Sequence, residues 1–148
     1  MSEKNHNNSS SEKLGYLQLI QEPICRMSTI SAIFKGFAAT VVAGISMIAY
    51  ENVSTIILGL SFLPVIAFFL LDVYYLQLER KFRFLYNEVA CDRHPIDYSL
   101  KLNLSKEQLF QAKATICCCL KSPSIYLFYP IMGLISLVVF MLEVHNVV

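Results

Sequence analysis

Two charged residues stand at the edges of uncharged stretches, where an ionisable side chain could do chemistry. Lys35 lies five residues into an apolar run that begins at Ile30, and Asp72 follows the uncharged run 53–71. If the two runs form an antiparallel hairpin, both charges lie at similar depth, and pairing them would offset the cost of holding each near hydrocarbon. The alternatives are a site in an ion or proton path, or two separate side chains that reach back to the lipid headgroups. Because the centre of each run is apolar, the sequence disfavours a proton-coupled transporter or channel.

Cysteine and histidine do not have the spacing of a metal site. Three cysteines are consecutive, at 117–119, and neighbours on a helix point about 100° apart, so they cannot converge on one tetrahedral ion. Cys91 and His94 have the spacing of one ligand pair but lack a matching second pair. The chain also has no nucleophile elbow and no phosphate-binding loop. We therefore expect no metal, no cofactor and no catalytic residue, and the protein is not expected to be an enzyme.

The elements that must position Lys35 and Asp72 have the length of membrane spans. The runs 30–50 and 53–71 each hold about twenty residues, which cross ~30 Å of hydrocarbon at 1.5 Å per residue. Only two residues separate them, so the chain must turn back at once. A third uncharged run covers 125–142, with Pro130 expected to kink it. With 55% hydrophobic and 16% charged residues, the 148-residue chain is predicted to be an all-α membrane protein with three transmembrane helices.

The remaining segments divide around these spans. The polar residues 1–11 predict a disordered tail, and 12–28 predict an amphipathic lead-in helix that lies at the inner membrane surface and is interrupted by Pro23. The two-span hairpin covers 29–76, a cytosolic helical segment covers 77–122, and the third span with a short outer tail covers 123–148. Ser105 and Gln108 form a capping box that predicts a helix from Lys106 to about Leu120, and Ser122 before Pro123 predicts another helix start.

Small side chains recur every fourth residue along the first span. They form one stripe on a helix, and in lipid such stripes allow close approach of helices. The stripe could pack against the second span of the same chain or against another subunit, and the sequence leaves both open. Its residues are Ala32, Gly36, Thr40 and Gly44, with Ser28 one turn before them.

A seam of apolar residues continues the helical pattern beyond the second span. Leu78, Phe82 and Leu85 lie at its centre, and the spacing of four and three residues is that of a heptad. The second span should therefore continue out of the membrane as one long helix. The seam either joins neighbouring subunits or a cytosolic partner, or folds onto other helices of the same chain.

Positive charge is distributed on one side of the spans. All twelve lysines and arginines lie before the middle of the first span or between the second and third, and Arg80, Lys81 and Arg83 directly follow the second span. The positive-inside rule then predicts a multi-pass inner-membrane protein with its N-terminus in the cytosol and its C-terminus outside. The net charge of +1 gives no basis for binding nucleic acid. The expected partners are the lipid bilayer, further copies of the chain and a cytosolic protein.

The sequence between 16 and 89 resembles a group of small bacterial inner-membrane proteins. The resemblance is carried by the following residues: Arg26-Met27, Ser31, Lys35-Gly36 and Thr40, then Phe62, Pro64, Phe68, Leu71-Asp72, Tyr74-Tyr75, Glu79-Arg80, Phe82-Arg83 and Leu85-Tyr86. The layout is also similar to SLATT-type two-span effectors of phage defence, although this chain has one span more. The resemblance implies a self-associating effector that disrupts or depolarises the membrane in an antiphage defence system, with no catalytic residue to carry over. The alternative is a non-toxic membrane anchor that recruits a cytosolic partner.

Overall fold

The computed structural model describes residues 2–49, 59 and 62–147, and every regular element within them is a helix. The predicted all-α fold class is therefore confirmed. Two helices are long and apolar enough to cross a membrane, at Ser10–Met47 and Phe62–Ala90. A bent pair of helices later in the chain raises the number of candidate spans to three if it counts as one. The Glu51–Asn52 turn lies outside the described residues.

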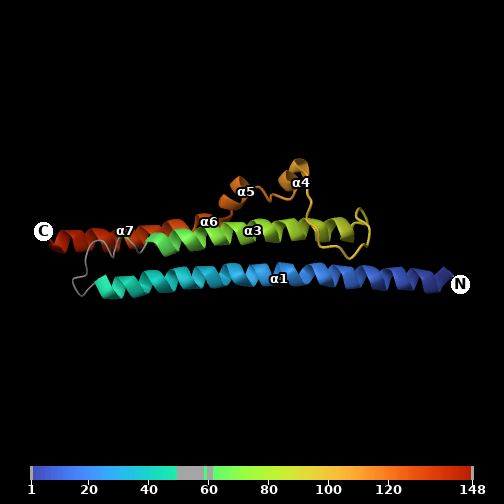
Figure 1. Ribbon diagram of the computed structural model, residues 1–148, viewed down its shortest axis with the longest axis horizontal. Coiled ribbons are helices and arrows are strands. Elements are labelled where there is room, and N and C mark those ends of the chain that lie inside the picture. The colour runs from blue at the N-terminus through green and yellow to red at the C-terminus, as the bar shows by residue number, and fades with distance from the viewer. Residues whose placement is uncertain (1, 50–58, 60–61, 148) are drawn as a thin grey trace.

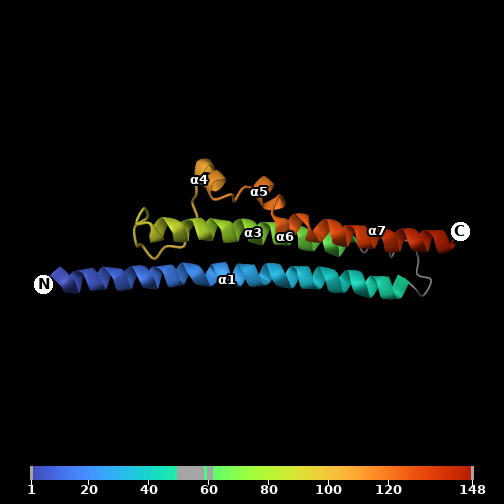
Figure 2. The same cartoon turned by 180° about the vertical axis from the view of Figure 1, so that it is seen from behind.

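A long antiparallel hairpin organises the molecule. Helix α1 (Ser2–Ala49) extends over the full length of the hairpin, and α3 (Phe62–Ala90) runs back alongside it (Figures 1 and 2). At 1.5 Å per residue, the 48 residues of α1 extend about 72 Å, far more than a bilayer requires. The prediction that the second span continues as one helix into the charged region is confirmed, because α3 is unbroken from Phe62 to Ala90.

The N-terminal region differs from the two segments predicted for it. A disordered tail at 1–11 and a separate surface helix at 12–28 were expected, but α1 is continuous from Ser2 through Pro23 into the span. Proline removes one backbone donor and clashes with the preceding turn. Here the helix continues because its apolar side packs along α3 both before and after Pro23, and extending a formed helix costs little.

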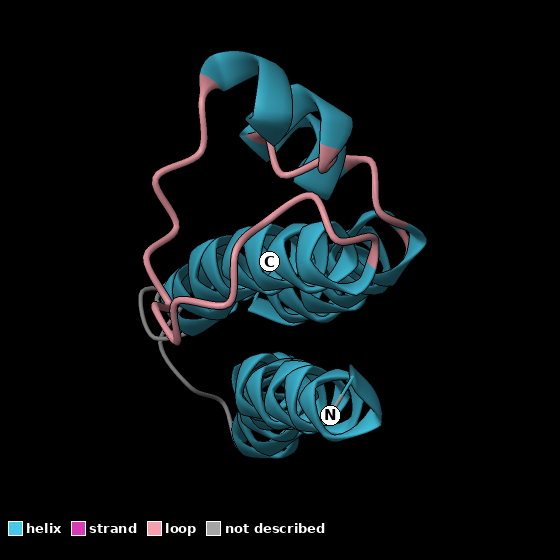
Figure 3. Ribbon diagram, turned by 90° about the vertical axis from the view of Figure 1, so that its right-hand side faces the viewer, coloured by secondary structure: helices cyan, strands magenta, loops and turns pink. Residues whose placement is uncertain are grey.

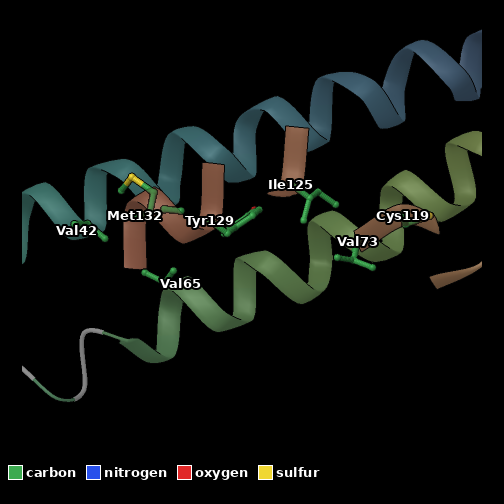
Figure 4. Close-up of a cluster of buried hydrophobic side chains, with 8 residues drawn as sticks. Val42, Val65, Val73, Cys119, Ile125, Tyr129 and Met132 are labelled. Atoms are coloured by element: carbon green, nitrogen blue, oxygen red, sulfur yellow. The ribbon is translucent and has the colours of Figure 1, made fainter. Parts of the chain in front are cut away.

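The hairpin has two cores, one at each end. Apart from Cys119, the first lies in the apolar half of the molecule, which we define as residues 30–49, 62–76 and 123–142. Figure 4 shows its side chains converging from α1, α3 and the C-terminal helices. The second lies in the basic half, residues 10–29 and 77–122. The buried members of the first are Ala38, Val42, Val65, Val73, Cys119, Ile125, Tyr129 and Met132, and those of the second are Tyr16, Ile20, Ile24, Phe82, Leu85 and Val89.

Residues 106–120 form two short helices where one was predicted. The Ser105–Gln108 capping box is present and starts α4 (Lys106–Gln111), but α5 (Ile116–Leu120) follows only after a break. The break is a Schellman motif: the Ala114 amide donates to the Leu109 carbonyl at 2.9 Å, and Lys113 has a left-handed φ of 51°. The Arg80 guanidinium donates to the carbonyl oxygen of Lys113 at 2.6 Å, which helps to hold this unfavourable conformation.

The C-terminal run also starts in two pieces. Ser122 precedes α6 (Pro123–Tyr126) with proline at its first turn, as predicted, although the serine side chain makes no capping bond. Helix α7 (Phe128–Val147) follows, and the stretch Lys106–Tyr126 meets Phe128–Leu142 at 61°. The predicted kink at Pro130 is not the place of this bend. Pro130 lies in the first turn of α7, where its missing N–H has no helical partner to lose.

Candidate functional site: a buried polar cluster between the helices

Lys35 and Asp72 come together across the hairpin. The Lys35 Nζ lies 2.5 Å from Asp72 Oδ2, and Asp72 is fully buried while the Lys35 side chain is 17% exposed. α1 and α3 run antiparallel, so residues near the start of the first apolar run meet residues at the end of the second. The hairpin geometry thus positions both charges at one depth, with the ammonium on the more open side.

Ser31 completes the cluster from the turn before Lys35. Its hydroxyl donates to Asp72 Oδ1, and Lys35 Nζ donates to Ser31 Oγ at 2.8 Å. Ser31 was not among the predicted site residues. The signal was present in the sequence, because a residue four positions before Lys35 lies on the same face of the helix.

The third apolar helix adds a hydroxyl beside the carboxylate. The Tyr129 hydroxyl donates to the Phe68 carbonyl oxygen at 3.2 Å, one turn of α3 before Asp72, and it also interacts electrostatically with the Asp72 carboxylate. No pattern in the sequence distinguishes Tyr129, since only the tertiary structure shows which part of α7 packs at this level.

The main chemical feature of the cluster is the Asp72 carboxylate, which is buried in a low-dielectric environment. Beyond its ion pair with Lys35, the Oδ2 atom of Asp72 has no hydrogen-bond partner among the described residues. A buried carboxylate of this kind depends on its counter-ion, because an isolated charge near hydrocarbon costs several kcal/mol. Within the described part of the chain, His, Cys, Asp and Glu form no group of three that could hold a metal ion. The cluster therefore ties the helices together electrostatically, and its arrangement does not identify a reaction.

The small-residue stripe lies away from the other helices. Ala32, Gly36 and Thr40 are exposed and Gly44 is half-buried, whereas Ala38 and Val42 are buried in the core that α1 shares with α3 and α7. Two residues along a helix correspond to a rotation of about 200°, so the stripe faces almost directly away from the hairpin interface. A Cβ atom added at Gly36 or Gly44 would meet no atom within 4 Å. Within the described residues, the exposed part of the stripe at Ala32, Gly36 and Thr40 is therefore not covered by the chain's own helices.

The apolar seam is occupied within the chain. Phe82 and Leu85 are buried against Tyr16 and Ile20 of α1, and Leu78 packs beside them. Of the two interpretations left open, folding onto the chain's own helices is therefore the one that the structure shows.

The three basic residues after the second span have separate contacts. Arg80 donates to the Lys113 carbonyl oxygen, and Arg83 forms an ion pair with Glu79 at 2.8 Å, one turn earlier on α3. Lys81 is half-buried. Their predicted part in setting membrane orientation remains a prediction.

A loop after α3 is fastened onto the N-terminal part of α1, which the sequence did not indicate. The Tyr16 hydroxyl is shared between Asp97 Oδ1, at 3.0 Å, and the Ser99 carbonyl oxygen, at 2.7 Å. Lys13 pairs with Asp92 at 2.6 Å. The Ser99 amide and the Tyr16 hydroxyl, both donating to the Asp97 carboxylate, hold its pKa below the usual range. These contacts join segments about eighty residues apart and close the end of the hairpin that lies far from the apolar half.

Comparison with protein-family models, with curated proteins and with solved structures found no match to this chain.

Proposed function

We propose that this chain is a multi-pass protein of the bacterial inner membrane that self-associates and impairs the barrier of the membrane as the effector of an antiphage defence system. Its N-terminus and basic half lie in the cytosol, and the C-terminus of α7 lies outside. The apolar half, with two or three helices that could span a membrane, supports the location. The distribution of lysine and arginine supports the orientation.

The observation that carries self-association is the outward-facing stripe of α1. Helices in lipid gain nothing from hydrophobic burial against one another, and they associate where small residues let their backbones approach. Ala32, Gly36 and Thr40 form such a surface, and the chain's own helices leave it open. The Thr40 hydroxyl donates to the Gly36 carbonyl oxygen at 2.9 Å, so it can lie in lipid without an unsatisfied donor. A second copy of α1 fits this surface.

The proposed loss of the membrane barrier requires a path for ions, either through one protomer or between protomers. The buried charges in the apolar half are paired inside the protomer at Lys35 and Asp72, so they stabilise the hairpin and do not line a path through it. A pathway for ions would then have to form between protomers, where the α1 stripes meet. The phage-defence context is supported by the resemblance of residues 16–89 to SLATT-type effectors.

The test replaces Gly36 by leucine. Because a side chain at Gly36 meets nothing in the protomer, the fold should persist, whereas a leucine should prevent close approach of two α1 helices. We expect the variant to lose cross-linked oligomers in membranes and to lose both the depolarisation and the protection seen when the wild-type chain is expressed with its neighbouring genes during infection. Gly36→Ala is the matched control and should retain all three properties, since alanine is still small.

Oligomers that survive in Gly36→Leu would show that the stripe is not the interface. Normal oligomers together with unchanged membrane potential in the wild type would instead favour the second candidate, an anchor that recruits a cytosolic protein. The exposed Phe110 of α4, with 73% of its surface accessible, is the feature that favours that candidate. Recovery of one soluble protein in a fixed ratio with the chain would support it.

A further inference from the structure

Residues 106–121 form a surface that the proposed effector function does not use, which we name the shelf. The shelf consists of α4, the Schellman turn and α5, and it lies on the far side of α3 from α1 (Figure 3). Its inner side is attached to α3 by buried Cys119, which belongs to the same core as Val73, and by the bond from Arg80 to the Lys113 carbonyl oxygen. The outer side of the shelf has no neighbour within the described residues.

That outer side combines apolar and positive groups. Phe110 is 73% exposed, Ile116 56% and Leu120 39%, so three large apolar side chains are accessible within eleven residues. All three lysines of the shelf, Lys106, Lys113 and Lys121, are exposed as well. Glu107 is the single acidic residue among residues 106–121, so the shelf has a net positive charge.

The shelf lies at the level where the apolar half ends. Val73, which shares a core with Cys119 of α5, directly follows Asp72 at the end of the uncharged run of α3. The chain then enters the apolar half again through α6, which begins two residues after Lys121. In Figure 1, α5 lies across α3 from the middle of α1, and α4 lies farther toward the end where α1 begins. Short helices at this depth meet the boundary between hydrocarbon and water.

We propose that the shelf docks on the surface of an anionic membrane, with Phe110, Ile116 and Leu120 inserted among the lipids and the three lysines beside anionic headgroups. Charge complementarity selects this occupant, because the cytosolic leaflet has a negative surface potential that attracts basic residues at the boundary. The arrangement also covers apolar surface that water would otherwise contact. The inference depends on the membrane location proposed above, and it is independent of self-association.

The absence of tryptophan from the chain allows a direct test. Phe110→Trp provides a single fluorophore on the shelf, and Ile96→Trp provides a matched control in the loop beyond α3, 37% exposed and outside the shelf. The full-length variants are reconstituted in phosphatidylcholine vesicles with or without about one third phosphatidylglycerol. We expect the Phe110→Trp variant to emit at shorter wavelength than the Ile96→Trp variant. Lipids brominated near the headgroup should quench it several-fold more strongly, and more so when phosphatidylglycerol is present.

Neutralising the lysines tests the electrostatic part. Each lysine near an anionic surface favours docking by about fivefold, so changing Lys106, Lys113 and Lys121 to glutamine in the Phe110→Trp background should remove the effect of phosphatidylglycerol. Ile116→Trp provides a second fluorophore on the shelf if Phe110→Trp does not fold.

Two results would overturn the proposal. The first is equal quenching of the shelf fluorophore and the loop fluorophore in chains that still resist alkaline extraction from the vesicles, which would leave the membrane location unaffected. The second is protection of the shelf fluorophore by a soluble protein and not by lipid.

Discussion

Replacing Lys35 by methionine should destabilise the hairpin strongly, because it removes the counter-ion of a carboxylate that is fully buried. Asp72 has no exposed surface, and without Lys35 it would keep the Ser31 hydroxyl as a hydrogen-bond donor but no positive charge beside it. Breaking a buried pair costs about 3–5 kcal/mol, and a charge at the centre of a membrane helix about 2.5–3.5 kcal/mol. Since the pair lies at the end of the apolar run, we expect a loss of about 3 kcal/mol for Lys35→Met.

Removing the charge of the other partner, Asp72, should cost less stability. In Asp72→Asn the lysine loses its partner, but its side chain is already 17% exposed and can extend toward the headgroups. We expect about 1–2 kcal/mol for this change. The double variant Lys35→Met, Asp72→Asn has no charge left to bury, and its stability should return to within about 1 kcal/mol of the wild type.

The assay is reversible unfolding of the four proteins in mixed micelles, followed by circular dichroism and analysed as a double-mutant cycle. Because the expected single costs sum to about 4–5 kcal/mol, a double variant within about 1 kcal/mol of wild type gives a coupling of about 3–5 kcal/mol. Additive losses in the double variant would refute the reasoning, since they would mean that each side chain contributes through separate contacts. Equal small losses, below about 0.5 kcal/mol in each single variant, would show that water reaches the pair.

Two further changes test the basic half. Lys113→Gly should stabilise the chain by about 1 kcal/mol in thermal unfolding, because glycine adopts the left-handed conformation of the Schellman turn without strain; no gain would mean that the Arg80 bond already compensates fully. Tyr16→Phe should lose about 1–2 kcal/mol and speed hydrogen exchange in the loop around Ser99, whereas unchanged exchange would show that the loop is held by other contacts. Because the pKa of Asp97 is depressed in the folded state, its contribution to folding stability is present above the unfolded pKa of about 3.9 and is lost as the pH falls through the folded pKa. The stability of Asp97→Asn should therefore differ from that of the wild type at neutral pH and converge with it in strong acid.

The helix starts could be predicted from the sequence, because they depend on neighbouring residues. The capping box at Ser105 and Gln108 satisfies two backbone donors within one turn, and the proline after Ser122 fixes its own backbone angle. The break at Lys113 could not be predicted in this way. A lysine in the left-handed region is unfavourable by itself, and it is accompanied here by Arg80, a residue 33 positions away that binds its carbonyl oxygen.

Only the part of the candidate site that follows from the position of residues along the hairpin could be predicted. Two charges at matched ends of an antiparallel hairpin are brought to the same level by chain length alone, which is why Lys35 and Asp72 could be proposed as a pair. Tyr129 could not be proposed, because the position of α7 beside α3 depends on packing between helices that no local pattern encodes.

The sequence by itself determined the helical class, the membrane-length apolar runs and the side on which positive charge gathers, since hydrocarbon thickness and backbone hydrogen bonding leave few other solutions for such runs. Only the tertiary structure decided which faces are used. The seam around Phe82 packs against residues 16–24 of α1, so the segment that was predicted as a surface helix is instead an extension of the first span. The stripe around Gly36 is left open. The reason is rotational: a periodic pattern fixes which residues share a helix face, but the direction of that face depends on what the rest of the chain packs against it.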